Sequence, residues 1–178
     1  KFQPLFHQYL MDANNNLFDQ LLSERVDYTK TKMFIGSARQ SARLDSSNIK
    51  SNPMTGSCFP AAQLVSNHLG SDFDPLLLAD IYEDLPFGTT FNNSFNPRKK
   101  PSDTKIPYDE TKVSILYAQM HKTALEYPNE NIVFEFFDDR EDIITALYGF
   151  YSQYPELIPS NINLQLNVYN NQFHGLEK

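Results

Sequence analysis

The chain of 178 residues has a single cysteine and no long apolar run. Because Cys58 is the only thiol, an internal disulfide and a cysteine metal cage are excluded, and a reducing compartment fits best. No apolar stretch approaches the roughly 18 to 20 residues that span a bilayer. The N-terminus also lacks the basic and apolar regions of a secretory signal. We therefore expect a cytoplasmic protein without a membrane span.

Positive charge is scarce as well. The chain has 15 Lys and Arg residues against 22 Asp and Glu residues, which gives a net charge of −7. The short run Arg98-Lys99-Lys100 does not offset this balance. Sequence-independent binding of nucleic acids depends on clustered cations that neutralise phosphates. We therefore expect no nucleic-acid partner.

Several common catalytic patterns are also missing. The four histidines are scattered, and no two of them have the spacing of a helical zinc site. Residues 36–41 lack the spaced glycines and the lysine of a Walker-type phosphate loop, although backbone amides there can bind an anion if a helix begins at this point. Cys58 has no histidine nearby, which favours a buried thiol over a nucleophile.

The chain contains enough apolar residues for one domain with a substantial core, and we expect this domain to span residues 1–178.

Periodicity predicts helices and strands in alternation, and Asn14-Asn15-Asn16 can split the first helix in two. This order predicts an α/β fold with a largely parallel sheet and helices on both faces. The expected helices are at 5–26, 59–69, 109–125 and 141–153, and the strands at 32–37, 76–82, 132–137 and 163–169.

Two segments without regular periodicity interrupt this pattern. Residues 38–57 are rich in Ser and Asn, and residues 86–107 contain several prolines and most of the local positive charge. Long loops in a compact domain commonly act as lids or binding loops. We expect cap or substrate loops in both places.

The most informative stretch is 132–142, an apolar run that ends in four acids around one arginine. Ligands collect beyond the carboxyl ends of strands in open α/β sheets. Mg²⁺ prefers oxygen ligands from one or two carboxylates, with phosphate and water completing its shell. Asp138, Asp139 and Asp142 are therefore candidate metal ligands. Alternatively, Asp138 or Asp139 caps the following helix, because Asp is favoured at the cap and in the first turn.

Two further side chains complete the requirements of a phosphate site. Ser37 ends a predicted strand and supplies a hydroxyl, and Lys112 supplies an ammonium group. Lys112 is expected in the first turn of a helix, where a positive charge is mildly unfavourable against the helix dipole. A bound phosphate would explain this choice. A solvated surface lysine would explain it too.

In this order the residues resemble the haloacid dehalogenase (HAD) superfamily of phosphatases and phosphotransferases. Met33-Phe34-Ile35-Gly36-Ser37 looks like the second motif of that family, Lys112 like the third, and residues 136–142 like the fourth. The resemblance covers roughly residues 33–169. It implies a HAD-like, Rossmann-like fold and hydrolysis of a phosphomonoester through an aspartyl-phosphate. Mg²⁺ would be held partly by Asp138 or Asp139, and Ser37 and Lys112 would steady the intermediate.

The first motif of the family has no clear copy ahead of the second motif, where the order of the family places it. That motif, Asp-x-Asp at the end of a strand, supplies the nucleophile and the general acid/base. The nearest match is Asp12 with Asn14, but Asn14 has no proton to exchange and the flanking residues are predicted to be helical. We expect the first strand to lie upstream of Lys1.

The substrate class follows from the remaining charges and from composition. Arg39, Arg98 and Lys99 are candidate contacts for an acidic substrate. The abundance of Asn, Ser, Tyr and Phe resembles effector proteins that intracellular bacteria such as Legionella secrete. A secreted effector would act inside the host cell on a host phosphoprotein, with phosphotyrosine as a plausible target.

Two other functions fit the same residues. The absence of Asp-x-Asp ahead of the second motif favours a non-catalytic HAD-like protein-binding module of a bacterial effector. An α/β enzyme that uses Asp138 or Glu141 as a general acid/base without a metal is the third reading. Retained metal binding would separate the phosphatase from this last reading.

Overall fold

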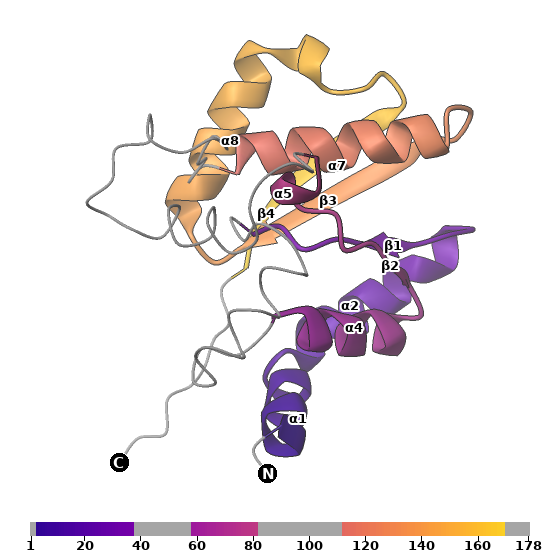
Figure 1. Cartoon of the computed structure of the whole chain (residues 1–178), viewed down its shortest axis with the longest axis vertical. Helices are drawn as coiled ribbons and strands as arrows, with labels where there is room; N and C mark the ends of the chain where they lie inside the picture. Colours follow the sequence, from indigo (N-terminus) through magenta and orange to yellow (C-terminus); the bar gives the residue numbers. More distant parts are fainter. Residues whose placement is uncertain (1–2, 38–57, 82–111, 170–178) are drawn as a thin grey trace.

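A computed structural model of the chain describes residues 3–37, 58–81 and 112–169 (Figure 1). Helices and short strands are mixed along the chain, so the expectation of an architecture that combines α and β elements is confirmed at this level. The described elements, in order, are α1 (Gln3–Ala13), α2 (Asn15–Glu24), η1 (Arg25–Asp27), β1 (Lys32–Met33), α4 (Cys58–Leu69), β2 (Asp72–Phe73), α5 (Leu78–Ile81), α7 (Val113–Glu126), β3 (Ile132–Asp138), α8 (Glu141–Gln153), η3 (Pro155–Leu157) and β4 (Ile162–Val168).

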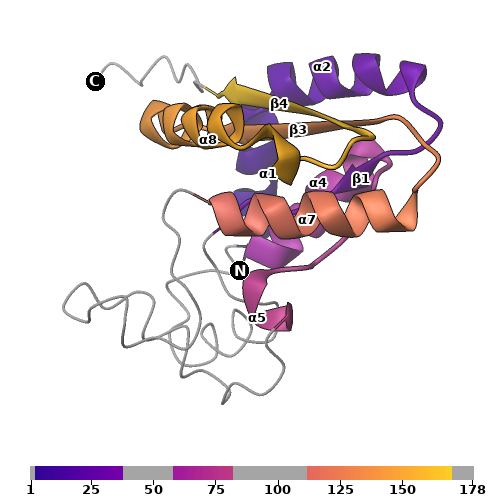
Figure 2. The same cartoon turned by 90° about the horizontal axis from the view of Figure 1, so that it is seen from above.

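The described strands form two separate parallel pairs. In one pair β1 lies beside β2, with Lys32 opposite Asp72. In the other, β3 lies beside β4 over seven residues, from Ile132 opposite Ile162 to the last residues of the two strands. Parallel neighbours need a crossover connection, and these connections contain α4 and α8. Figures 1 and 2 show β1 and β3 running in the same general direction.

The main core lies where α7 and α8 cover one face of β3 and β4. Alternate side chains of a strand point to opposite faces, so Ile132, Phe134 and Phe136 share the face that packs into this core. The helices contribute Leu116 from α7 and Leu147 from α8, and both side chains are fully buried. Figure 1 shows α7 and α8 on one side of the strands and α1, α2 and α4 on the other.

The strongly periodic segments of the sequence fold as predicted. The expected elements at 132–137, 141–153 and 163–169 match β3, α8 and β4 within one residue at each end. The first helix is broken where the asparagines stand. Asn14 separates α1 from α2, and its side-chain amide donates to the Leu10 carbonyl at 2.7 Å. This bond to the backbone is the competition that makes Asn a poor helix former.

The strand predicted at 76–82 is wrong. This segment contains the short helix α5, and the strand β2 comes earlier in the chain. Pro75 has no N–H to continue the β2 ladder. The Leu77 N–H donates to Asp80 Oδ2 at 2.8 Å, which satisfies a free donor at the start of the helix. A short apolar run is buried in either conformation, so periodicity alone cannot distinguish the two.

Two predicted boundaries also differ from the structure. The strand expected at 32–37 pairs with β2 over Lys32 and Met33 only. The helix expected from 109 begins at Val113, and the predicted cap Asp109 is outside the described residues. The cap or substrate loops expected at 38–57 and 86–107 are outside them too. None of the described helices combines the length and the apolar character needed to cross a lipid bilayer.

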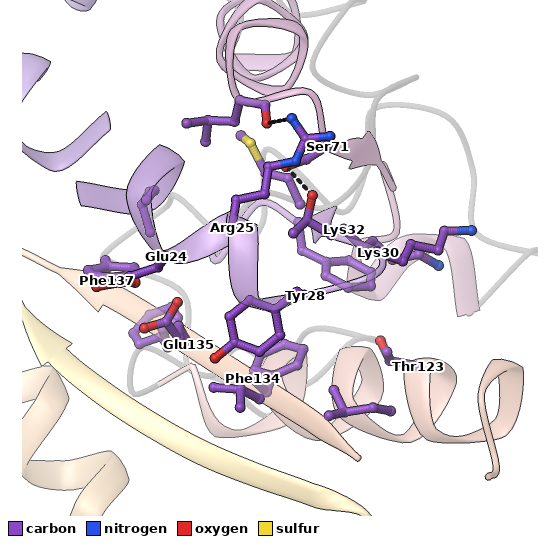
Figure 3. Close-up of a pocket in the computed structure, with 18 of the residues that line it drawn as sticks. Glu24, Arg25, Tyr28, Lys30, Lys32, Ser71, Thr123, Phe134, Glu135 and Phe137 are labelled. Carbon is purple, nitrogen blue, oxygen red and sulfur yellow. Dashed lines mark hydrogen bonds between the residues drawn. The ribbon is translucent and has the colours of Figure 1, made fainter. Parts of the chain in front are cut away.

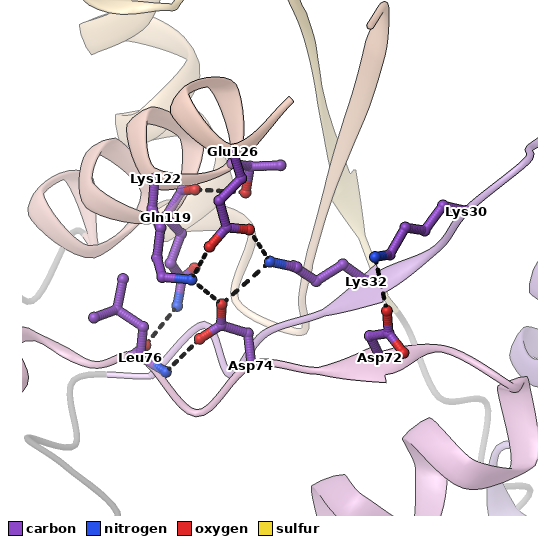
Figure 4. A network of polar contacts seen from close by, with 9 residues as sticks. Lys30, Lys32, Asp72, Asp74, Leu76, Gln119, Lys122 and Glu126 are labelled. Carbon is purple, nitrogen blue, oxygen red and sulfur yellow. Dashed lines mark hydrogen bonds and ion pairs between the residues drawn. The ribbon is translucent and has the colours of Figure 1, made fainter. Parts of the chain in front are cut away.

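A cluster of four charges joins the β1–β2 pair to α7 (Figure 4). Asp74 forms ion pairs with Lys32 at 3.4 Å and with Lys122 at 2.5 Å, and both lysines also contact Glu126. Partial burial of Asp74 on its own would raise the pKa of this carboxyl. Hydrogen bonds from Lys122 and from the Leu76 backbone outweigh burial and hold the pKa below its ordinary value. The cluster is therefore charged at neutral pH and fixes α7 against the strands.

Leu116→Ala should lower the free energy of unfolding by about 2–5 kcal/mol, because it removes a fully buried side chain and leaves a cavity. Leu125→Ala is a matched control in the same helix, since Leu125 is 81% exposed. We expect a change within about 0.5 kcal/mol for the control. Urea denaturation of both variants followed by circular dichroism tests this, and equal losses would contradict the core described above.

Candidate functional site

Asp138 is the last residue of β3, and each oxygen of its carboxylate has a partner. The side chain is buried, and Oδ2 forms an ion pair with the Lys112 ammonium group. The other oxygen, Oδ1, accepts a hydrogen bond from the Arg140 backbone N–H at 2.9 Å. A charged carboxylate is thus held at the carboxyl end of a parallel strand, which is the place where ligands bind in such sheets.

The balance of forces on Asp138 favours its charged form. Burial on its own would raise the pKa of the carboxyl. The hydrogen bond from Lys112, the backbone N–H of Arg140 and the positive charge of the lysine outweigh burial and hold the pKa of Asp138 below its ordinary value. At neutral pH the carboxylate is therefore negative and faces the lysine as a true ion pair.

Lys112 stands immediately before α7 and not in its first turn, which corrects the position expected from the sequence. Its backbone is left-handed, with φ of +65° and ψ of 15°, a conformation that costs a residue with a side chain about 1–3 kcal/mol. The side chain is only 18% exposed, and Nζ lies 5.6 Å from the centre of the Phe136 ring. A solvated surface lysine is therefore the wrong description.

The other acids of the cluster are arranged differently. Asp142 is exposed and accepts hydrogen bonds from Arg140 Nε at 3.1 Å and Nη2 at 2.5 Å, and these bonds hold the pKa of Asp142 below its ordinary value. Asp139 and Glu141 are exposed. Arg140 occupies the cap position of α8 without a side-chain cap bond, so neither Asp138 nor Asp139 caps this helix. Within the described ranges no three His, Cys, Asp or Glu side chains are gathered as a metal cage.

Ser37 follows a close approach between the two strand pairs. A Cβ at the preceding residue, Gly36, would lie 2.3 Å from Cε2 of Phe136, a distance that real Cβ atoms do not show. Glycine therefore allows the Phe136 ring to reach the backbone that leads to Ser37. Phe136 is two residues before Asp138, near the end of β3. The backbone at Gly36 contacts this part of β3, and the half-buried Ser37 is the next residue in the chain.

The remaining predicted contacts are not brought to this place by the structure. Arg39, Arg98 and Lys99 lie outside the described residues. Asp12 is exposed on α1, and Asn14 bonds to the Leu10 carbonyl and to the Tyr169 hydroxyl. The nearest copy of the first motif is therefore part of a helix and its end, as its flanking residues predicted.

Two features of the site escaped the sequence analysis. Gln119 of α7 is buried, and its amide donates to the carbonyls of Ile35 at 3.0 Å and Leu76 at 3.2 Å. A polar residue on the apolar face of a predicted helix was the available signal. The second feature is a cavity of about 440 Å³ between β1 and β3 (Figure 3). Sequence periodicity carries no signal for such a gap.

Comparisons with protein-family models, curated proteins and solved structures found no match to this chain. The function is therefore to be inferred from the residues of the site.

The charged state of Asp138 can be tested through the pH dependence of stability. A carboxyl whose pKa is lower in the folded state contributes stability that is fully present above the unfolded value of about 3.9, and this contribution is lost as the pH falls through the folded value. Asp138→Asn should therefore weaken the protein at pH 7 and flatten its loss of stability below about pH 5.

Urea denaturation between pH 3 and 7 measures this difference. Asp72→Asn serves as the control, because Asp72 is exposed and paired with the exposed Lys30. The control should keep the slope of the unsubstituted protein. An equally steep loss in Asp138→Asn would show that the carboxylate is not held in its charged form by Lys112.

Proposed function

We propose that the chain is a Mg²⁺-dependent phosphatase of the HAD type, which hydrolyses a phosphomonoester at the edge where β3 ends. The observation that carries this proposal is the partly buried ion pair between Lys112 and Asp138. It joins a strained left-handed residue to a carboxylate at the end of a parallel strand. Strained backbones cluster at active sites and ligand clamps, and a buried ion pair by itself is weak evidence of a purely stabilising role.

The residues of this edge supply what a phosphoryl group needs. The Lys112 ammonium offsets the charge of the phosphate oxygens, and the Ser37 hydroxyl donates a hydrogen bond to one of them. Asp138 is a positioning residue, since it holds the lysine side chain at the end of the strand. Fixed charges of this kind stabilise the transition state without reorganisation during the reaction.

The resemblance implies an aspartate nucleophile on a strand that the described residues do not include. Its carboxylate oxygen attacks phosphorus and the bond to the ester oxygen breaks. The alcohol leaves with a proton from the second aspartate of the Asp-x-Asp motif, the general acid/base that the resemblance implies, and this aspartate takes a proton back from the water of the next step. Water then hydrolyses the phosphoaspartate, which releases inorganic phosphate and restores the carboxylate. This sequence of steps needs no other reactant.

The acids at the end of β3 suit Mg²⁺ in type and number. Mg²⁺ usually binds one or two carboxylates and completes its shell with substrate phosphate and water. Asp138 and Asp139 would provide these ligands, while Asp142 is held by Arg140. When bound, Mg²⁺ would offset the charge of the phosphoryl oxygens. As substrate we favour a phosphoprotein, a host protein if the chain is a secreted effector, with phosphotyrosine as the first residue to test.

A HAD-like protein-binding module without catalysis is the second candidate. Two observations favour it: the chain has no Asp-x-Asp ahead of the second motif, and no three acids are gathered as a metal site within the described ranges.

Hydrolysis of p-nitrophenyl phosphate and of a phosphotyrosine peptide by the full-length protein tests the phosphatase. Turnover should require Mg²⁺ and stop in EDTA. Lys112→Gly should lower kcat/KM by about 100-fold or more, the usual effect of removing one transition-state donor. Glycine accepts the left-handed backbone without cost, so this variant removes the ammonium group without adding strain.

Lys30→Ala is the matched control, because Lys30 is an exposed lysine paired with Asp72 at the opposite end of β1. It should keep the unsubstituted rate. Turnover that survives EDTA, or full activity in Lys112→Gly, would overturn the proposed site. A folded protein with no turnover on either substrate would leave the binding module as the better proposal.

A further inference from the structure

The two strand pairs turn open edges toward the same cavity. On β3, the Ile132 N–H donates to the Asn161 carbonyl at 2.9 Å, and the Asp138 carbonyl accepts from Tyr169 N–H at 2.8 Å. Backbone groups of successive residues in a strand point to opposite sides. The even-numbered residues of β3 therefore bond to β4, and Val133, Glu135 and Phe137 direct their N–H and C=O groups away from β4.

The same alternation holds for β1. The carbonyls of Thr31 and Met33 accept from the β2 side at 3.0 and 2.9 Å. The backbone groups of Lys32 and Phe34 therefore point away from β2. Phe34 makes no backbone hydrogen bond with another described residue. Every backbone N–H and C=O group in a strand can form a hydrogen bond, so both strands have hydrogen-bonding capacity on the sides away from their partners.

The lining of the cavity shows that these free edges face it. All residues from Ile132 to Phe137 line it, although their side chains alternate between two faces. The consecutive residues from Lys30 to Phe34 line it as well. A surface formed by consecutive strand residues is an edge and not a face. Figure 3 shows Phe134, Glu135 and Phe137 of β3 across the cavity from Lys30 and Lys32.

Side chains cross the gap where backbone bonds are missing. The rings of Phe34 and Phe134 lie 6.0 Å apart, and the Phe136 ring reaches Gly36. The Phe134 and Phe136 rings lie on the core face of β3. Two strands that flank a third are about 9.5 Å apart, twice the usual spacing of about 4.8 Å. Two strands at this separation cannot bond through their backbones, but large aromatic side chains on one face can still reach across. The contacts between the segment of β1 and β3 are of this kind.

Helices cover both sides of the gap. Leu17, Phe18 and Leu21 of α2 line it on one side. Gln119 and Thr123 of α7 line it on the other. A strand placed between them would be buried on both faces, and such strands are continuous apolar runs. The length of β3 sets its size at about five to seven residues.

We infer that an apolar strand that precedes α1 in the natural polypeptide fills this gap, parallel to β1 and β3. The two described pairs and this strand would form one continuous parallel sheet with the order β2, β1, new strand, β3, β4. The backbone groups of Lys32, Phe34, Val133, Glu135 and Phe137 are its hydrogen-bonding partners.

The handedness of the connections identifies this occupant. Parallel crossovers are right-handed in nearly all proteins. Crossovers that move in the same direction across a sheet therefore place their helices on the same face. A step from the gap to β1 has the same direction as the step from β1 to β2, whose connection contains α4. The helices α1 and α2 precede β1 and pack against α4, as a strand directly before α1 requires.

This inference does not depend on phosphatase activity. It uses backbone bonds, cavity lining and handedness, whereas the proposed function uses Lys112 and Asp138. A strand can fill the gap in a protein that does not hydrolyse phosphate, and the two proposals fail in different measurements.

Amide hydrogen exchange and cross-strand NOEs of the full-length protein, measured by NMR, test the inference. The amides of Val133, Glu135 and Phe137 should exchange at least about 1,000-fold more slowly than in an unfolded chain, as expected for core strands. They should also show NOEs to residues that precede α1. The amides of Phe134 and Phe136 bond to β4 and serve as the internal control, since they are protected whether or not the gap is filled.

Three outcomes would overturn the inference. Fast exchange at Val133, Glu135 and Phe137 beside protected control amides would show that the edge is open. Slow exchange without NOEs to residues before α1 would show that another group covers it. NOEs between differently labelled copies, together with the mass of a dimer in solution, would assign the gap to a second copy of the chain.

Discussion

The burial of β3 is the constraint on which the rest of the structure depends. Its even-numbered side chains enter the core beneath α7 and α8, and its even-numbered backbone groups bond to β4. These two requirements fix both the rotation and the register of the strand. A shift by one residue would turn the core face toward α2 and would move the carboxylate at its end away from the lysine. The candidate site is thus a direct product of how β3 is buried.

The ion pair at the end of β3 combines two costs in one place. Lys112 adopts a backbone conformation that disfavours any side chain, and Asp138 loses water on burial. The ammonium group of Lys112 offsets part of the cost of burying the Asp138 carboxylate, because it gives the carboxylate a charged hydrogen-bond donor. Replacing such pairs by apolar residues is often neutral or stabilising. Their presence at a strand end therefore agrees better with a role in ligand binding than with a role in folding.

The sequence predicted those elements whose signal is local and repeated. Apolar periodicity located β3, α8 and β4, and the asparagine run located the break after Ala13. It failed at 76–82, where a short apolar run suits a buried helix as well as a buried strand. The left-handed backbone of Lys112 has no signature in periodicity, because it concerns one residue. The acids after β3 were found, but which of them the lysine contacts depends on how α7 packs.

The gap between β1 and β3 was outside the reach of sequence reasoning for a different reason. It depends on which strand edges remain free after the pairs have formed, and this is a property of the folded chain as a whole. The resemblance to the HAD superfamily predicted a strand upstream of Lys1, but nothing in the sequence placed that strand in the fold. Only the free backbone groups of residues such as Phe34 and Glu135 give that expectation a place in the structure.

Every lysine that the structure describes is paired with an acid. Lys30 pairs with Asp72, Lys32 and Lys122 share two carboxylates, and Lys112 pairs with Asp138. An incoming phosphate therefore meets no unbalanced lysine in this part of the chain. The ammonium group of Lys112 keeps N–H donors that its bond to Asp138 does not use, so a phosphate can bind this lysine without breaking the pair. The negative charge of Asp138 opposes the phosphate, and tight binding of an anion at this edge therefore calls for a second cation beside the lysine.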